Sequence, residues 1–415
     1  MATTTVKFIA MLIIGLVVGL GIGYVIAIPK GTQEVKISEY VIGMPADLSG
    51  PGADYGIEVR DAGLLTVEEI NEFLKKNNIP IRFKLEVEDS KTTVEGAVQA
   101  VQSLAGKGVK VIVGHLWSGQ LGGVKSYVDS HKILTISVSS TSPTLSVKDY
   151  IFRVQAPDSV QGKVLAKLIW ELGYRKVAVV YRNDPYGSGV FKYFNDAFKN
   201  LGGTVKSLAY TPDQPDYSSE VLKLSSMVKD LGADSKTAVL IVAFNYEAIK
   251  LFDKARHDKI LSSVRWFSSE SLKGPGFLPP ASPPEIGDFA VKVNLTGTYP
   301  ATLTVTELMK EFSKKFKARY GREPKGYGAY TYDALWLVAL SIITAGTDDG
   351  ETLLKVLPVI AERFTGATGP LVFDENGDRA LQDYQIWQVI KTDKGYDFRI
   401  IGGYSGASGE LKLFY

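Results

Sequence analysis

The chain has 415 residues, of which 22% are charged and 45% are hydrophobic, and its formal net charge is +2. This length predicts about two or three globular domains, and the balanced charge gives no sign of nucleic-acid binding. The absence of cysteine excludes disulfides, thiolate metal sites and a lipidated cysteine anchor. The three histidines, His115, His131 and His257, lack the spacing of metal ligands, so no metal or other cofactor is predicted.

Residues 1–34 predict a membrane anchor, or an uncleaved signal helix, followed by a linker. The apolar run Phe8–Ile28 is long enough to cross a bilayer and longer than most signal-peptide cores. No convincing small-residue cleavage site follows it. Lys7 and the α-amino group favour an amino terminus inside the cell, although Lys30 and Lys36 count against this orientation. We therefore expect an extracytoplasmic body tethered to the cell membrane by residues 8–28.

The segment that follows alternates between strand and helix patterns. Short runs rich in β-branched residues predict buried parallel strands, and the longer segments between them have the apolar periodicity of amphipathic helices. This βαβ order is typical of an α/β domain whose parallel sheet is covered on both faces. The strands are expected at Val35–Met44, Ile81–Glu88, Val109–Val113 and Ile133–Val138, and the helices at Ile57–Lys76 and Thr92–Gly106.

A second, similar cycle begins after Val154 and indicates a second lobe of the same kind. Its strands are expected at Val177–Tyr181, Thr204–Tyr210, Ala238–Phe244 and Val264–Ser268, with helices between them. Helical patterns return at Val305–Tyr320 and Tyr332–Ala345. Phe364–Arg379 then predicts a strand and a turn leading into a hairpin with Tyr384–Ile390.

Small hydroxyl residues follow two of the predicted strands of the first lobe. Ser118 comes shortly after Val109–Val113, and Ser139, Ser140 and Thr141 come directly after Ile133–Val138. Ligands of open α/β sheets bind beyond the carboxyl ends of the strands, where backbone amides and helix N-termini are free. Such a cluster suits a small anion such as a carboxylate. The alternative, that these residues only cap helices, stays open from this segment alone.

Seven segments in order resemble the type I periplasmic binding proteins, and in particular the leucine/isoleucine/valine-binding branch that serves ABC transporters. The resemblance extends from about Val35 to Gly403. The segments are Ile42–Gly56, VEEIN at Val67–Asn71, Gly114–Ser118, SSTSPTL at Ser139–Leu145, FRVQAPDSVQG at Phe152–Gly162, VAVVYRNDPYGSG at Val177–Gly189 and TGATGPLVFDENGDR at Thr365–Arg379.

The resemblance implies two Rossmann-like α/β lobes joined by three crossovers, with the ligand in the cleft between the lobes. It assigns residues 35–154 and 294–362 to lobe 1 and residues 155–293 and 363–403 to lobe 2. The crossovers are expected near Val154, Val293 and Arg363, and residues 404–415 are expected to form a C-terminal tail.

The same resemblance assigns roles to individual residues. Ser118 and the amide of Thr141 would hold a ligand carboxylate, whereas the carbonyl of Ser139, the hydroxyl of Thr141 and the carboxylate of Glu270 would hold its ammonium. Trp117 departs from the family pattern, in which a small residue is usual, so it either reshapes the pocket or belongs to the core. The candidate ligand-binding residues are Tyr55, Trp117, Ser118, Ser139, Ser140, Thr141, Tyr186, Tyr246, Glu270 and Tyr327.

The resemblance predicts a substrate-binding protein that delivers an amino acid, branched-chain or otherwise apolar, to the permease subunits of an ABC transporter. One alternative is a receptor for a small amide, urea or an organic acid, which the effect of substituting Glu270 would distinguish. Another is a ligand sensor that acts through a partner protein. An enzyme is not expected, because the chain has no GxSxG, HExxH or P-loop motif.

Overall fold

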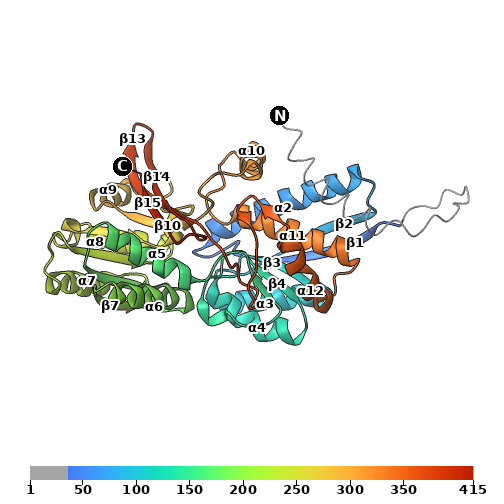
Figure 1. Cartoon of the computed structure of the whole chain (residues 1–415), viewed down its shortest axis with the longest axis horizontal. Coiled ribbons are helices and arrows are strands. Elements are labelled where there is room, and N and C mark those ends of the chain that lie inside the picture. The colour runs from blue at the N-terminus through green and yellow to red at the C-terminus, as the bar shows by residue number, and fades with distance from the viewer. Residues whose placement is uncertain (1–35, 415) are drawn as a thin grey trace, which may run out of the picture.

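The computed structural model describes residues 36–414, which form two α/β lobes side by side (Figure 1). The predicted membrane anchor at residues 8–28 lies outside the described residues. Among the described helices, the one long and apolar enough to span a membrane is α11 (Gly328–Ala345). However, 78% of its apolar window is buried inside the first lobe, so α11 is a core helix here.

The first lobe is built on a five-stranded parallel sheet with the strand order β2-β1-β3-β4-β5. Helix α11 packs against α2 and α12, so a late part of the chain completes this lobe. Its strands are β1 (Ser38–Ala46), β2 (Ile81–Asp89), β3 (Val111–Gly114), β4 (Leu134–Ser137) and β5 (Ile151–Arg153), and its helices are α2 (Ala53–Lys76), α3 (Val94–Gly106), α4 (Ser118–Ser130), α10 (Glu307–Tyr320), α11 and α12 (Gly350–Ala361).

The second lobe is built on an eight-stranded sheet with the order β15-β14-β13-β10-β9-β8-β6-β7. The part from β7 to β10 is parallel, whereas β13, β14 and β15 extend it as antiparallel strands. Its strands are β6 (Lys176–Arg182), β7 (Thr204–Tyr210), β8 (Thr237–Val242), β9 (Arg265–Ser268), β10 (Thr296–Pro300), β13 (Tyr384–Thr392), β14 (Gly395–Tyr404) and β15 (Leu411–Leu413), and its helices are α5 (Asp158–Glu171), α6 (Pro185–Asn200), α7 (Ser218–Asp230), α8 (Asn245–Ala255) and α9 (Pro284–Lys292).

The chain passes between the two lobes three times, after β5, after β10 and after α12. The predicted boundary at Val293 is wrong by one strand, because β10 pairs with β9 and β13 in the second sheet. Residues 404–415 are also more than a tail, since β15 pairs with β14 at the edge of the same sheet. The predicted hairpin differs too, because β13 turns back onto β14 instead of pairing with residues 364–379.

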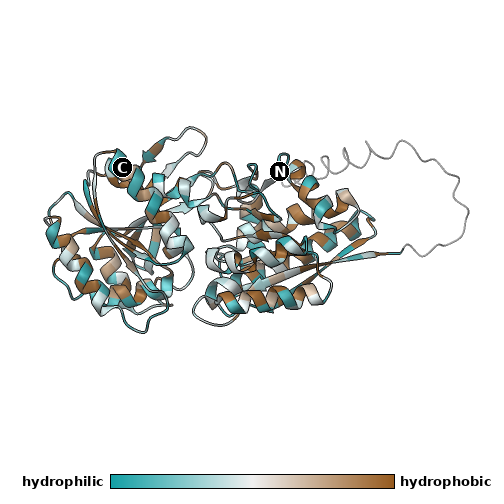
Figure 2. Ribbon diagram, turned by 90° about the horizontal axis from the view of Figure 1, so that it is seen from below, coloured by the Kyte–Doolittle hydropathy of each residue, from teal (hydrophilic) through white to brown (hydrophobic). Residues whose placement is uncertain are grey.

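The buried strands explain why their sequences are almost uniformly apolar. Every residue of β8, TAVLIV, is buried because helices cover both faces of the parallel sheet. Hydrophobic residues line the inward faces of the helices and the sheets of both lobes, and hydrophilic residues lie outside (Figure 2). Each lobe therefore has the packed core that lets it hold side chains rigidly at its edge.

Candidate ligand-binding site

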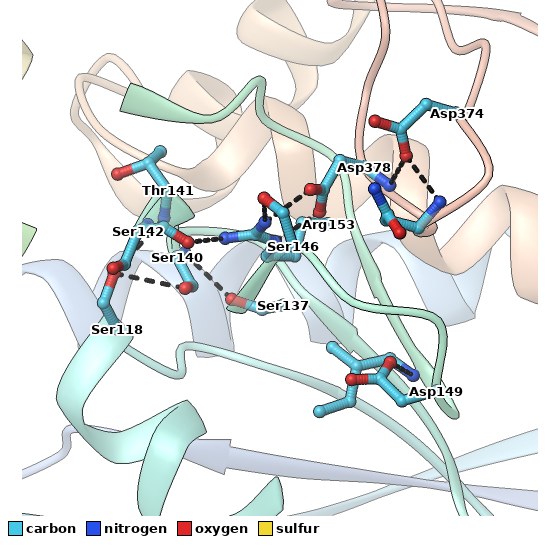
Figure 3. Close-up of polar contacts among 12 residues, drawn as sticks. Ser118, Ser137, Ser140, Thr141, Ser142, Ser146, Asp149, Arg153, Asp374 and Asp378 are labelled. Carbon is cyan, nitrogen blue, oxygen red and sulfur yellow. Dashed lines mark hydrogen bonds and ion pairs between the residues drawn. The ribbon is translucent and has the colours of Figure 1, made fainter. Parts of the chain in front are cut away.

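The hydroxyl residues predicted from the sequence form one cluster at the carboxyl ends of β3 and β4. The Ser118 hydroxyl, in the first turn of α4, accepts hydrogen bonds from the amides of Thr141 (3.3 Å) and Ser142 (3.2 Å) and lies 3.2 Å from the Ser140 hydroxyl (Figure 3). The Ser137 hydroxyl accepts from the amide of Ser140 at 2.9 Å. All three of these contacts of the Ser118 hydroxyl are with residues 140–142 outside its own helix. Ser118 therefore ties two loops together.

A buried ion pair between two of the interlobe segments also holds the loop that contains Ser140 and Ser142. Arg153, at the end of β5, donates to both carboxylate oxygens of Asp378 at 2.5 Å, and each of the two residues is about 1% exposed (Figure 3). The same guanidinium donates to the carbonyl of Ser142 at 2.6 Å. Because Arg153 and Asp378 lie on the first and third interlobe segments, the hinge itself fixes the position of the loop.

Several polar atoms at the boundary between the lobes are buried without a hydrogen-bond partner among the described residues. They include the hydroxyls of Ser139 and Thr141, both carboxylate oxygens of Asp158 and one oxygen of Glu270. Leaving one such atom unpaired costs about 1–3 kcal/mol. Their concentration on two facing lobes marks a site suited to a polar ligand.

Two carboxyl groups in this site are buried close enough together to influence each other's pKa. Asp158 begins α5, and Glu270 begins the short helix η3 (Glu270–Lys273). Burial raises the pKa of both groups, and the charge of Glu270 raises the pKa of Asp158 further. The charge of Arg153 opposes this rise at Asp158, but neither acid forms an ion pair among the described residues. A positively charged ligand group would therefore stabilise their ionised forms. Asp158 was not among the predicted residues, although it lies within the FRVQAPDSVQG segment.

The predicted aromatic residues form one group on each lobe, and Phe244 brings the two groups together. Trp117 and Tyr55 of the first lobe are 5.4 Å apart between ring centroids, and Tyr327 is 5.9 Å from Tyr55. Phe244, which the sequence analysis missed, follows β8 and stacks on Tyr186 of its own lobe at 5.5 Å. Its ring centroid also lies 4.2 Å from that of Trp117 in the other lobe. These rings close the site on one side.

Two hydrogen bonds join the lobes beside these rings. The Tyr55 hydroxyl donates to the carbonyl of Ser271 at 2.7 Å, and the Ser142 hydroxyl donates to the carbonyl of Pro185 at 2.9 Å. Tyr246 is placed at the edge of the cluster, 6.1 Å from Phe244. The structure thus has the two lobes in contact, as in a closed form.

Trp117 is held in the core of the first lobe, which was one of the two predictions for it. Its indole nitrogen donates to the buried Asp47, which also accepts from Ser90 (2.5 Å) and Gln120 (2.8 Å). Burial alone would raise the pKa of Asp47, but His115 and the hydrogen bonds from Ser90 and Gln120 hold it below its ordinary value. The indole is therefore anchored in the first lobe, while its ring forms part of the site wall.

Comparison with known proteins identifies the family to which this arrangement belongs. The model of the periplasmic binding protein family matches residues 39–395. The chain belongs to this family. Two lobes, three interlobe segments and a polar site between the lobes are accordingly features of a periplasmic binding protein, and membership places the body outside the cytoplasm.

Individual relatives agree with this assignment. An uncharacterized protein of Methanocaldococcus jannaschii is 27% identical over 92% of this chain and 93% of its own length. The leucine-, isoleucine-, valine-, threonine-, and alanine-binding protein of Pseudomonas aeruginosa is 25% identical over 84% of this chain and 90% of its own length. The branched-chain amino acid transporter substrate binding protein of Streptococcus pneumoniae, in complex with isoleucine, shares the fold with a TM-score of 0.69 and 21% identity, covering 88% of this chain and 100% of that one.

Proposed function

We propose that this periplasmic binding protein captures an amino acid with an apolar side chain between its lobes and presents it to the permease subunits of an ABC transporter. The observation that carries the proposal is the arrangement of unpartnered buried polar atoms, with hydroxyls on one lobe and two carboxyl groups on the other. The amino-acid ligands of the Pseudomonas and Streptococcus proteins support an amino acid as the ligand here.

The two ends of such a ligand would bind to different parts of the site. The first turn of α4 and the hydroxyl of Ser118 suit the carboxylate, since helix N-termini attract anions. The hydroxyl of Thr141 and the carboxyl groups of Asp158 and Glu270 suit the ammonium. The rings of Trp117, Tyr327 and Phe244 would enclose the apolar side chain.

Closure of the lobes would couple binding to delivery. A ligand that contacts both lobes stabilises the closed form by its greater affinity for that form. A permease that recognises the closed shape then receives only the loaded protein. In this proposal, residues 8–28 anchor the body to the membrane beside the permease.

A thermal-shift screen of the full chain in detergent against the twenty amino acids tests the proposal. A ligand at a hundred times its Kd adds about 2.7 kcal/mol to the stability of the folded state, so a true ligand raises the unfolding temperature clearly. Glu270→Gln should weaken binding at least about tenfold, because it removes a charge-assisted hydrogen bond. Glu285→Gln, on α9 outside the site, is the matched control.

One observation favours a second candidate, a small neutral amide or urea. The raised pKa of Asp158 and Glu270 means that the pair can retain a proton, and a protonated carboxyl group can donate to a carbonyl. In that case urea or an amide would raise the unfolding temperature, and no amino acid would. Binding of an amino acid that is unchanged by Glu270→Gln would contradict the ammonium-binding role.

A further inference from the structure

A second cavity, distinct from the site described above, lies on the hinge side of the molecule. It has a volume of about 680 Å³, and none of the ten predicted ligand-binding residues lines it. Its walls come from both lobes. The second lobe contributes β10, the β13–β14 hairpin and the segment after η3, and the first lobe contributes α10 and α11. In Figure 1, α10 and the β13–β14 hairpin rise on the same side of the molecule.

Lys273 brings a positive charge into this cavity. Its ammonium group donates to the neutral side chain of Gln385 at 3.0 Å and lies 4.4 Å from the ring centroid of Tyr299. Within residues 36–414 no carboxylate lies within ion-pair distance of it. Partial burial lowers the pKa of Lys273 to about 8, and the charge of Asp397 offsets only part of this shift.

The remaining lining residues make the cavity positive and largely apolar. Lys310 and Lys325 also line it, whereas Asp397 is the single acidic residue among its lining residues. Lys310 is already paired with Glu307 at 2.6 Å. The apolar part of the wall comes from Leu278, Pro300, Val305, Met309, Ala329 and Phe398.

We propose that this cavity is a second ligand site, which takes a small organic carboxylate with an apolar body. The carboxylate would pair with the Lys273 ammonium, and the body would lie against the apolar wall. Lys273 is half-buried, so a counter-charge placed beside its ammonium group would stabilise it more than it would a fully solvated lysine. A cation or a neutral polar solute would leave Lys273 unpaired. This inference does not depend on amino-acid binding at the first site.

Calorimetric titration of the full chain with sodium benzoate tests the proposal. We expect saturable binding, weakened at least about tenfold by Lys273→Met, because the charge-assisted hydrogen bond is lost. Lys273→Arg should retain most of the affinity. Lys206→Met is the matched control and should leave the affinity unchanged, since Lys206 lies on β7 outside the cavity and pairs with Asp230. Benzyl alcohol, which keeps the ring without the charge, should bind at least about tenfold more weakly than benzoate.

The fold of each variant is checked by its unfolding temperature without ligand, which Lys273→Met should leave unchanged or raise. The proposal is overturned if benzoate does not bind to the wild type, or if Lys273→Met binds it with unchanged affinity. It is also overturned if Glu270→Gln abolishes benzoate binding and leucine displaces benzoate, because benzoate would then occupy the first site. Benzoate binding that survives Glu270→Gln supports the second site even if no amino acid binds.

Discussion

The region between the lobes buries charge in two ways. Arg153 and Asp378 neutralise each other through two hydrogen bonds of 2.5 Å. Asp158 and Glu270, by contrast, have carboxylate oxygens without a hydrogen-bond partner, and neither forms an ion pair within residues 36–414, although the charge of Arg153 acts to lower the pKa of Asp158. A buried ion pair with good geometry fixes the position of its neighbours. A buried polar group without a partner, by contrast, is stabilised when a ligand supplies the missing partner. The comparison separates the residues that hold the site in shape from those that we propose bind the ligand.

Breaking the hinge pair should have the largest effect on stability. Asp378→Asn leaves the Arg153 guanidinium buried without its counter-charge, which typically costs about 3–5 kcal/mol. We expect a correspondingly lower urea midpoint and a weaker amino-acid affinity, because Arg153 also holds the carbonyl of Ser142. Asp393→Asn, at an exposed position in the turn between β13 and β14, is the control. A loss below about 1 kcal/mol would show that the pair does not stabilise the hinge.

Neutralising one of the two unpaired acids should weaken ligand binding without lowering stability. Asp158→Asn removes a group that is costly to ionise when buried, so the ligand-free protein should be as stable as the wild type or more so. Amino-acid affinity should fall about tenfold or more, since a bond to the ammonium is lost. Calorimetric titration together with urea unfolding measures both. A variant that is less stable but binds normally would show that Asp158 has only a structural role.

The stability of the wild type and of Asp158→Asn should also depend differently on pH. The folded-state pKa of Asp158 is raised, so the folded protein binds its proton more tightly than the unfolded chain does. The stabilisation is complete below the ordinary aspartate pKa and is lost as the pH rises toward the folded-state value. The free energy of unfolding of the ligand-free wild type should therefore decrease over this range. The decrease should be smaller in Asp158→Asn.

A single hydrogen bond between the lobes should give the smallest effect. Tyr55→Phe removes the bond to the carbonyl of Ser271 while keeping the ring in the aromatic cluster. Such a bond contributes about 0.5–1.5 kcal/mol to closure, so amino-acid affinity should fall about two- to tenfold. Tyr40→Phe, which loses a bond to Gly346 within the first lobe, should leave affinity unchanged. Equal effects of the two substitutions would contradict a role for Tyr55 in closure.

Much of the fold could be predicted because its local patterns agree with its tertiary environment. The apolar runs around Val111 and Leu134 are strands because a parallel sheet is buried on both faces. The local pattern could not predict to which of the two sheets β10 belongs. That assignment depends on pairing with β9 and β13, and β13 is more than eighty residues away in sequence.

In the site, too, the features with a local sequence signal could be predicted and the long-range contacts could not. The hydroxyl cluster was found because Ser118 and Thr141 each follow a strand, which is a local signal. The anchoring of Trp117 by Asp47 could not be found, because those residues are 70 positions apart. Phe244 looked like the end of an apolar strand, and its position against Trp117 is defined only when the lobes meet.

The three passages of the chain between the lobes also constrain how the protein is made. The core of the first lobe includes α11, which packs against α2, although about 250 residues separate the two helices. During synthesis on the ribosome, the apolar residues of the amino-terminal part of the first lobe stay partly exposed. They can be covered only when α11 emerges, after most of the second lobe has been synthesised. We therefore expect neither lobe to fold as an excised fragment, and we expect slow assembly that benefits from chaperones.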